Sequence, residues 1–280
     1  VLKLLKSGKV PPTRMGSVVE MICTRGNEHD LAFVFQQAMD ENTYAPALRQ
    51  QVLGWLKDAA TNRKVVPGDR SGLSRLLDPA VTPDRTLQLR GIALAHAWKE
   101  VSVAADLGKL ARARESQPEV RESALTALVV VDAATAREIA RELLGEEQPF
   151  ASRSLGVTTL VGLDLPAGAK AAATVLKSAT PADDPAPVVD AILDREGGAA
   201  ALGNALQSTP LPRDVAKLCL RRVYAAGRSD AVLLDVLAPQ AGVSAKPVKL
   251  TKEEVAQWAL AAETGDAAPV SYTHLRAHET

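Results

Sequence analysis

Apolar residues recur along most of this chain at helical spacing, with polar residues between them. In the segment that begins at Pro118, the apolar positions Val120, Ala124, Leu125 and Leu128 lie on one side of a helix. Comparable segments continue to about residue 238 and are separated by short turns rich in Gly, Pro, Asn and Asp. The pattern predicts an all-α protein.

The apolar segments fall into successive pairs of helices. The first pair is expected at about 12–25 and 28–39, and the second at about 45–60 and 71–78, with a loop insertion at 61–70. The other expected helices are one around Arg153 and those at about 84–99, 101–114, 118–128, 133–145, 167–179, 186–195, 198–207, 212–226 and 229–238.

One short pattern repeats five times: an arginine with small or apolar residues three, four and seven positions later. The intervals between these arginines are 35, 41, 31 and 32 residues, and prolines stand three positions before the first, second and fourth. A period of this length with helical apolar spacing is typical of an α-solenoid, in which helix pairs stack into a superhelix. The arginines are Arg14, Arg49, Arg90, Arg121 and Arg153.

The unit Pro118–Leu128 resembles the consensus of HEAT repeats. This resemblance implies an α-solenoid of about seven stacked HEAT-like helical hairpins, arranged as a right-handed superhelix over residues 1–238. The pattern weakens after Thr180, so five regular units are expected to precede two degenerate ones.

A cation in the first turn of a helix opposes the positive end of the helix dipole, by about 0.3–1 kcal/mol. The repeated arginine therefore needs a compensating partner, and its planar fork can bridge two acceptors. We expect that partner to be a carboxylate or a free carbonyl of the neighbouring unit, which would form a ladder of contacts along the stack. The alternative is a row of arginines that binds an anionic ligand.

Beyond the repeats, residues 239–249 have the composition of a linker, and 250–266 are expected to form a helix opened by a capping box at Thr251–Glu254. That helix would lead to a further domain, and 267–280 are expected to be unstructured. Residues 270–280 resemble a translated sequencing adapter, and this removes His274 and His278 from consideration as a zinc pair. The chain also opens within a helical pattern, so we expect it to be a segment of a longer protein, with further chain before residue 1 and after residue 269.

Composition narrows the range of functions. Hydrophobic residues make up 46% of the chain but aromatic residues only 3%, so the core must consist of Ala, Leu and Val in closely approaching helices. The chain has 33 basic and 33 acidic residues, and it therefore lacks the global field that attracts nucleic acid. No stretch approaches the roughly 18 apolar residues of a membrane span.

Candidate chemistry is sparse. Cys23 and Cys219 lie in apolar helical patterns, and buried structural thiols are expected rather than a disulfide or a reactive site. His29, between two carboxylates, is expected at a capped helix start rather than at a metal. His96 is expected to be a packed or partly exposed side chain rather than a ligand or base. No phosphate-binding loop or nucleophile elbow is found, so no catalytic, cofactor or metal residue is assigned within 1–269.

The repeats, the linker and the segment Val248–Ala268 together resemble the middle region of large haem c-binding, membrane-bound dehydrogenase-like proteins of planctomycetes. In that family HEAT repeats precede a c-type cytochrome domain. The resemblance implies a non-catalytic scaffold segment of a periplasmic oxidoreductase, with haem c in a downstream domain and with neighbouring domains as partners. No Cys-x-x-Cys-His motif lies in this chain.

Two other functions fit a helical repeat. One is a stand-alone cytosolic module that binds a partner protein. The other is a DNA-binding HEAT protein of the glycosylase type, which the balanced charge and the lack of a basic or aromatic row disfavour.

Overall fold

A computed structural model describes residues 1–227 and 230–243 of the chain. Within these residues every element of secondary structure is a helix, as the apolar spacing predicts. The elements are α1 (Leu2–Lys6), α2 (Pro12–Arg25), α3 (Glu28–Met39), α4 (Pro46–Arg63), α5 (Leu73–Leu77), α6 (Arg85–Trp98), the short 3₁₀ helix η1 (Val101–Val103), α7 (Ala104–Arg112), α8 (Pro118–Val131), α9 (Ala133–Leu143), α10 (Phe150–Leu163), α11 (Leu165–Lys177), α12 (Ala186–Leu193), α13 (Gly198–Gln207), α14 (Arg213–Ala225) and α15 (Ala231–Ala241).

Local sequence explains where several helices begin. Pro12, Pro46 and Pro118 each occupy the first helical position, where the missing N–H would lack a helical partner in any case. Helix α3 begins at a capping box, in which Asn27 accepts from the backbone N–H of Asp30 while the Asp30 carboxylate accepts from the backbone N–H of Asn27.

Several helix boundaries differ from the sequence expectation by two or three residues, and two of them fall at the expected loop and linker. Helix α4 continues to Arg63, and Lys64 then ends it in the left-handed conformation. The expected linker begins at 239, but α15 runs through Pro239 to Ala241. The Gln240 side chain holds this last turn in place, because its amide oxygen accepts from Leu211 N and its amide nitrogen donates to Leu206 O. Residues 244–249 of the expected linker, the helix expected at 250–266 and the tail 267–280 lie outside the described residues.

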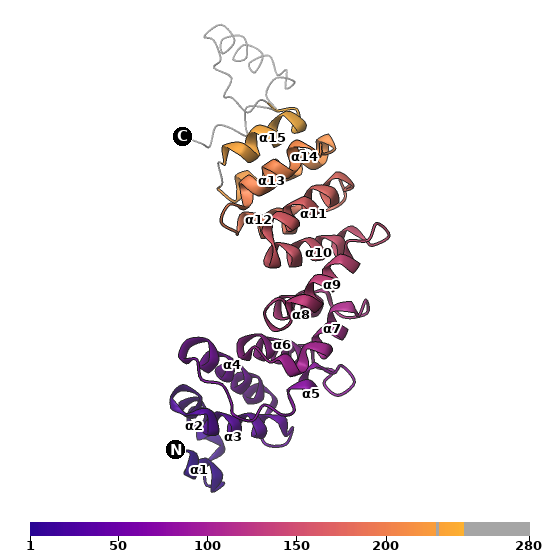
Figure 1. The fold of residues 1–280 in the computed structure, drawn as a ribbon. Helices are drawn as coiled ribbons and strands as arrows, with labels where there is room; N and C mark the ends of the chain where they lie inside the picture. Colours follow the sequence, from indigo (N-terminus) through magenta and orange to yellow (C-terminus); the bar gives the residue numbers. More distant parts are fainter. Residues whose placement is uncertain (228–229, 244–280) are drawn as a thin grey trace, which may run out of the picture.

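The helices follow one another in space as they do in the sequence (Figure 1). One row consists of α2, α4, α6, α8, α10, α12 and α14, which contact one another in that order. On the other side α5, α7 and α9 contact in order, as do α11, α13 and α15. The result is an elongated stack with α1 at one end and α15 at the other (Figure 1).

The hydrophobic core consists of two clusters that divide at α10. The first extends from Leu5 to Leu143 and the second from Val157 to Ala241, and both consist mainly of Leu, Val, Ile and Ala. Helix α10 contributes to each, and its buried polar residues Ser154 and Thr159 lie where the clusters separate.

Candidate functional site

The repeated arginines are the first candidate. Arg49 on α4 is only 8% exposed, and its Nε donates to the carbonyl oxygen of Ala38 at 2.7 Å. Ala38 lies in the last turn of α3, where carbonyls have no helical donor. Glu41 lies 3.7 Å from the guanidinium and adds a weak ion pair. This is the contact with a free carbonyl of the preceding helix pair that the sequence predicts.

Arg121 makes the same kind of contact. It stands three positions after the first residue of α8, as Arg49 does in α4, and its Nε donates to Ala111 O at 3.2 Å. Ala111 lies in the last turn of α7. In both helices the residue three positions after the first therefore contacts the end of the preceding helix.

The other three arginines do not continue this series, so the expectation of one ladder is wrong. Arg14 is exposed and has no side-chain hydrogen bond within the described residues. Arg90 lies across Gly54 of α4, and a Cβ there would be 3.6 Å from its Nη1. Arg153 donates through Nη1 to Ser178 Oγ at the end of α11, which is the next helix along the chain rather than the preceding one.

Helix register explains the misassignment at Arg90. The position in α6 equivalent to Arg49 and Arg121 is Gln88, which is buried and donates to Thr82 O at 2.9 Å. A neutral amide thus replaces the cation in this pair. Arg90 lies two positions beyond Gln88 in α6, so it falls on a different part of the helix surface.

Two further arginines, which the repeat pattern did not include, donate to a backbone carbonyl of the neighbouring helix in the first row. Arg63 at the end of α4 donates to Gly26 O at the end of α2. Arg195, just after α12, donates to Gly162 O in the last turn of α10 at 3.1 Å. The sequence feature that could have indicated them is an arginine at the end of an apolar segment. The negative end of the helix dipole also favours a cation at that position.

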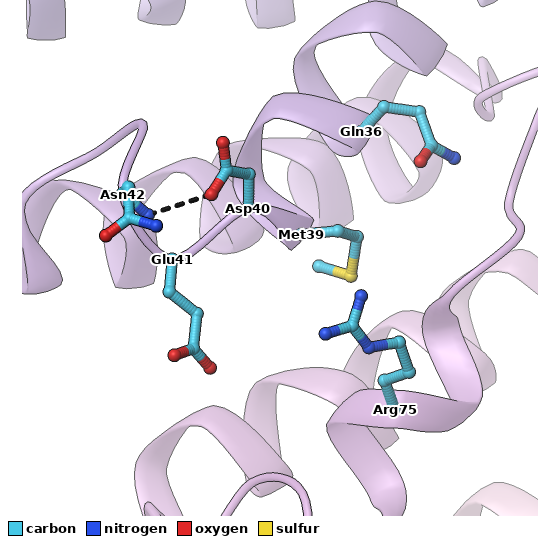
Figure 2. A pocket seen from close by; sticks show the side chains of 6 residues that line it. All are labelled: Gln36, Met39, Asp40, Glu41, Asn42 and Arg75. Carbon is cyan, nitrogen blue, oxygen red and sulfur yellow. Dashed lines mark hydrogen bonds between the residues drawn. The ribbon is translucent and has the colours of Figure 1, made fainter.

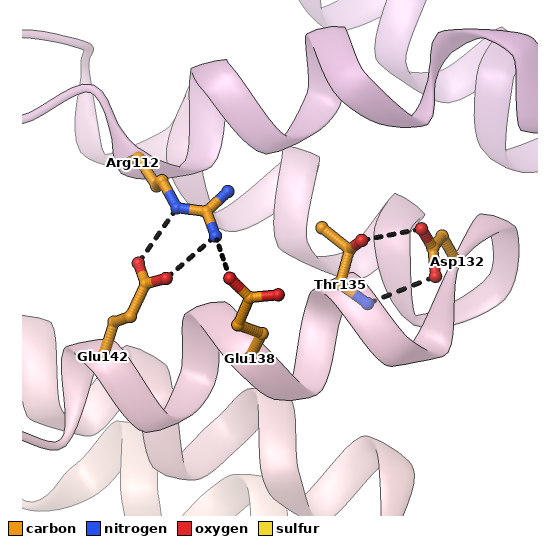
Figure 3. A network of polar contacts seen from close by, with 5 residues as sticks. All are labelled: Arg112, Asp132, Thr135, Glu138 and Glu142. Carbon is orange, nitrogen blue, oxygen red and sulfur yellow. Dashed lines mark hydrogen bonds and ion pairs between the residues drawn. The ribbon is translucent and has the colours of Figure 1, made fainter.

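A charged network joins α7 to α9 on the other side of the stack (Figure 3). Arg112 donates to both carboxylate oxygens of Glu142, at 2.9 and 2.8 Å, and to Glu138 at 3.2 Å. The hydrogen bonds from Arg112 lower the pKa of the Glu142 carboxyl. Nearby, Asp132 caps α9, and the Thr135 hydroxyl and backbone N–H that it accepts from lower its pKa.

We predict that replacing Arg112 with alanine lowers the free energy of unfolding by less than about 1 kcal/mol. The Arg112 side chain is 40% exposed, so water screens the pairs. The loss should shrink further in about 1 M salt, where the screening length falls to about 3 Å. Urea unfolding of both proteins at low and high salt tests this, and a larger loss that salt leaves unchanged would contradict it.

The two cysteines are buried, as the apolar patterns predict. Burial raises the pKa of the Cys23 thiol to about 12 against a smaller opposing effect of Arg63, and burial likewise raises that of Cys219 to about 12. The thiolate is the reactive form, so neither side chain is a candidate nucleophile.

We therefore predict that a thiol-specific disulfide reagent at about pH 8 labels neither cysteine in the folded protein, since a normal thiol has a pKa of about 8.5. The same protein in denaturant is the control and should release two equivalents. Rapid labelling of the native chain would show that one of these thiols is accessible.

The histidines outside the tail serve different roles. The backbone N–H of His29 donates to the Asn27 side chain, so this residue belongs to the capped start of α3, as expected. His96 is exposed on α6. Within the described residues no group of three or more His, Cys, Asp and Glu side chains is placed to hold a metal ion. His274 and His278 lie outside the described residues.

A cavity of about 480 Å³ lies between the end of α3 and α5 (Figure 2). Its wall includes Asp40, whose carboxylate already accepts from the Asn42 backbone N–H and the Thr43 hydroxyl. These bonds, with that of Asn42 the strongest, lower the pKa of Asp40. Glu41 and Arg75 face the same opening (Figure 2). The cavity is polar. The Asp40 carboxylate stabilises the turn that carries it, and the Glu41 carboxylate pairs with Arg49.

A second cavity, of about 280 Å³, lies between α8 and α10, where the two core clusters separate. We call it the α8–α10 groove. Its lining residues are His96, Glu122, Thr126, Val129, Val130, Leu155, Thr158, Thr159, Gly162 and Arg195. It combines an apolar floor with separated charges and is the best candidate for a binding site in the described part of the chain.

Comparisons with protein-family models, with curated proteins and with solved structures find no match for this chain. Over residues 1–227 and 230–243 the structure is all-α. None of its described helices is both long and apolar enough to cross a membrane.

Proposed function

We propose that the chain is an α-solenoid of seven HEAT-like hairpins, α2–α3 to α14–α15, with the right-handed superhelical hand expected from the sequence. We further propose that it acts as a non-catalytic scaffold that presents its surface to a partner protein or to neighbouring domains. The observation that carries the proposal is the ordered series of contacts from α2 to α14. In such a stack each repeat contacts only its neighbours, so the stack has a long surface and not a single central core.

The interhelical polar contacts support this proposal. Arg49 and Arg121 each tie a helix to the end of the preceding pair, and Arg63 and Arg195 tie successive helices of one row. Each of these contacts joins two neighbouring helices of the stack. They therefore stiffen the stack locally and do not join its distant parts. That property suits a part that sets the spacing of other domains.

Cross-linking mass spectrometry on the full-length parent protein, purified with its bound partners, tests the scaffold. We expect cross-links from lysines of several helix pairs, among them Lys57, Lys109 and Lys170, to other domains or to a partner. Cross-links confined to this chain would contradict the proposal.

The identity of the parent is a separate proposal that rests on the resemblance of Val248–Ala268 to planctomycete haem c-binding dehydrogenase-like proteins. It places the parent in the periplasm and electron transfer in a downstream domain. Reading the parent gene past residue 269 tests it: a Cys-x-x-Cys-His motif within about 30 residues supports it. A stop codon or further repeats would instead favour the stand-alone cytosolic module.

A further inference from the structure

We propose that the α8–α10 groove binds an amphipathic α-helix of a partner protein, which lies antiparallel to α8. The partner helix would insert two apolar side chains one turn apart, with an acidic residue facing Arg195 and a basic residue facing Glu122. This inference names a binding surface and a partner class for the scaffold function proposed above, and it rests on that function.

The floor of the groove, formed by the valine, leucine and threonine side chains of its lining, offers an apolar surface. Val129 and Leu155 are partly buried, and Val130 is 42% exposed although it is a large hydrophobic residue. The threonine hydroxyls in the lining donate to carbonyls of their own helices: Thr126 to Glu122 O, and Thr158 and Thr159 to Leu155 O. Their hydrogen-bond donors are therefore occupied, and apolar side chains are the groups that gain most from this floor.

The charges lie at opposite ends of the groove. A Cβ on Gly162 would lie 3.7 Å from Val129, so the ends of α8 and α10 adjoin there, and Arg195 binds the carbonyl of the same glycine. Glu122 lies seven residues before Val129 on α8, which is about two turns, or about 10 Å along the helix at 1.5 Å per residue. A helix carries acidic residues most favourably at its N-terminus and basic ones at its C-terminus. Charge complementarity thus directs the partner helix antiparallel to α8.

The size and walls of the groove select the kind of ligand. A volume of about 280 Å³ lies just below the range of roughly 300–1,000 Å³ that encloses a small molecule. The groove can instead hold one or two side chains of a larger ligand whose backbone stays outside the groove. The described residues present no sheet edge for a strand to join, and the lining has no Phe, Tyr or Trp to hold a proline-rich segment. The helix-in-groove mode is the one that fits.

The probe is a synthetic alanine-based peptide of about 15 residues, a length at which helices begin to form in water. It carries two central leucines four positions apart, Glu near its N-terminus and Lys near its C-terminus. Methyl NMR of the full chain should show shifts at Val129, Val130 and Leu155. Replacing both leucines with serine in the peptide should abolish these shifts.

Matched protein variants test the site. Val130→Lys should weaken peptide binding at least tenfold, whereas Val81→Lys, at a position of equal exposure (43%) beyond α5, should leave it unchanged. Glu122→Lys should also weaken binding, and a peptide with Glu in place of its Lys should restore it. Shifts outside the groove, no shifts at all, equal effects of both valine variants or no restoration would each overturn the inference. Cross-links from the parent to other surfaces would still support the scaffold, so the two proposals fail separately.

Discussion

Replacing Arg49 with alanine should lower the free energy of unfolding by about 2–4 kcal/mol, among the largest effects expected of any polar side chain here. The change removes the donor to Ala38 O, in a site where a carbonyl left without a partner costs about 1–3 kcal/mol. It also removes the long apolar stem of a side chain that is 8% exposed, so packing is lost with the charge. Chemical denaturation of the two proteins measures the difference.

Arg14→Ala is the matched control, because Arg14 has the same place in the sequence repeat but is exposed. Its loss should change stability by no more than about 0.5 kcal/mol. Arg49→Met keeps most of the stem and should recover part of the loss. Equal effects of Arg49→Ala and Arg14→Ala would show that the Arg49–Ala38 contact contributes nothing to stability.

Gly168→Ala should destabilise the protein by about 2–3 kcal/mol, although alanine is the better helix former. Gly168 lies in α11 where this helix approaches α10, and a Cβ there would be 2.7 Å from Val161 N and 2.8 Å from Val161 Cα. Because those atoms belong to the backbone, one helix must move away from the other to admit the methyl group. The core cluster that contains Val161 and Ala172 would then open.

Gly54→Ala is the matched control for this prediction. Gly54 lies inside α4, and its Cβ would meet only the flexible end of Arg90, at 3.6 Å. We expect this change to raise stability by roughly 0.5–1 kcal/mol through helix propensity. Thermal or urea unfolding should thus show effects of opposite sign, and stabilisation by both substitutions would mean that α10 and α11 do not approach as closely as the structure shows.

The sequence predicted the helices well because their signals are local. Apolar spacing, proline at the first helical position and the capping box at Asn27 act within a few residues, and helices such as Pro12–Arg25 and Glu28–Met39 lie where they were expected. The boundary at 239 failed for a tertiary reason. Gln240 binds two residues about thirty positions earlier, and these contacts hold a turn that Pro239 would otherwise discourage.

The candidate sites were less predictable. The expected role of the arginine is met at Arg49 and Arg121, whereas Gln88 takes the equivalent position in α6 and Arg153 binds the following helix. The α8–α10 groove had no signal in the sequence, since its ten lining residues come from 96 to 195 and none is unusual alone.

By itself, then, the sequence determined the all-α class and the burial of the two thiols, because helix formation and amphipathic burial depend on spacing within a single turn or two. Only the tertiary structure decided which arginine meets which carbonyl, where the core divides and where a groove opens. Those outcomes depend on the register and spacing between packed helices, and a side chain's partner on another helix is set by that packing rather than by its neighbours in the chain.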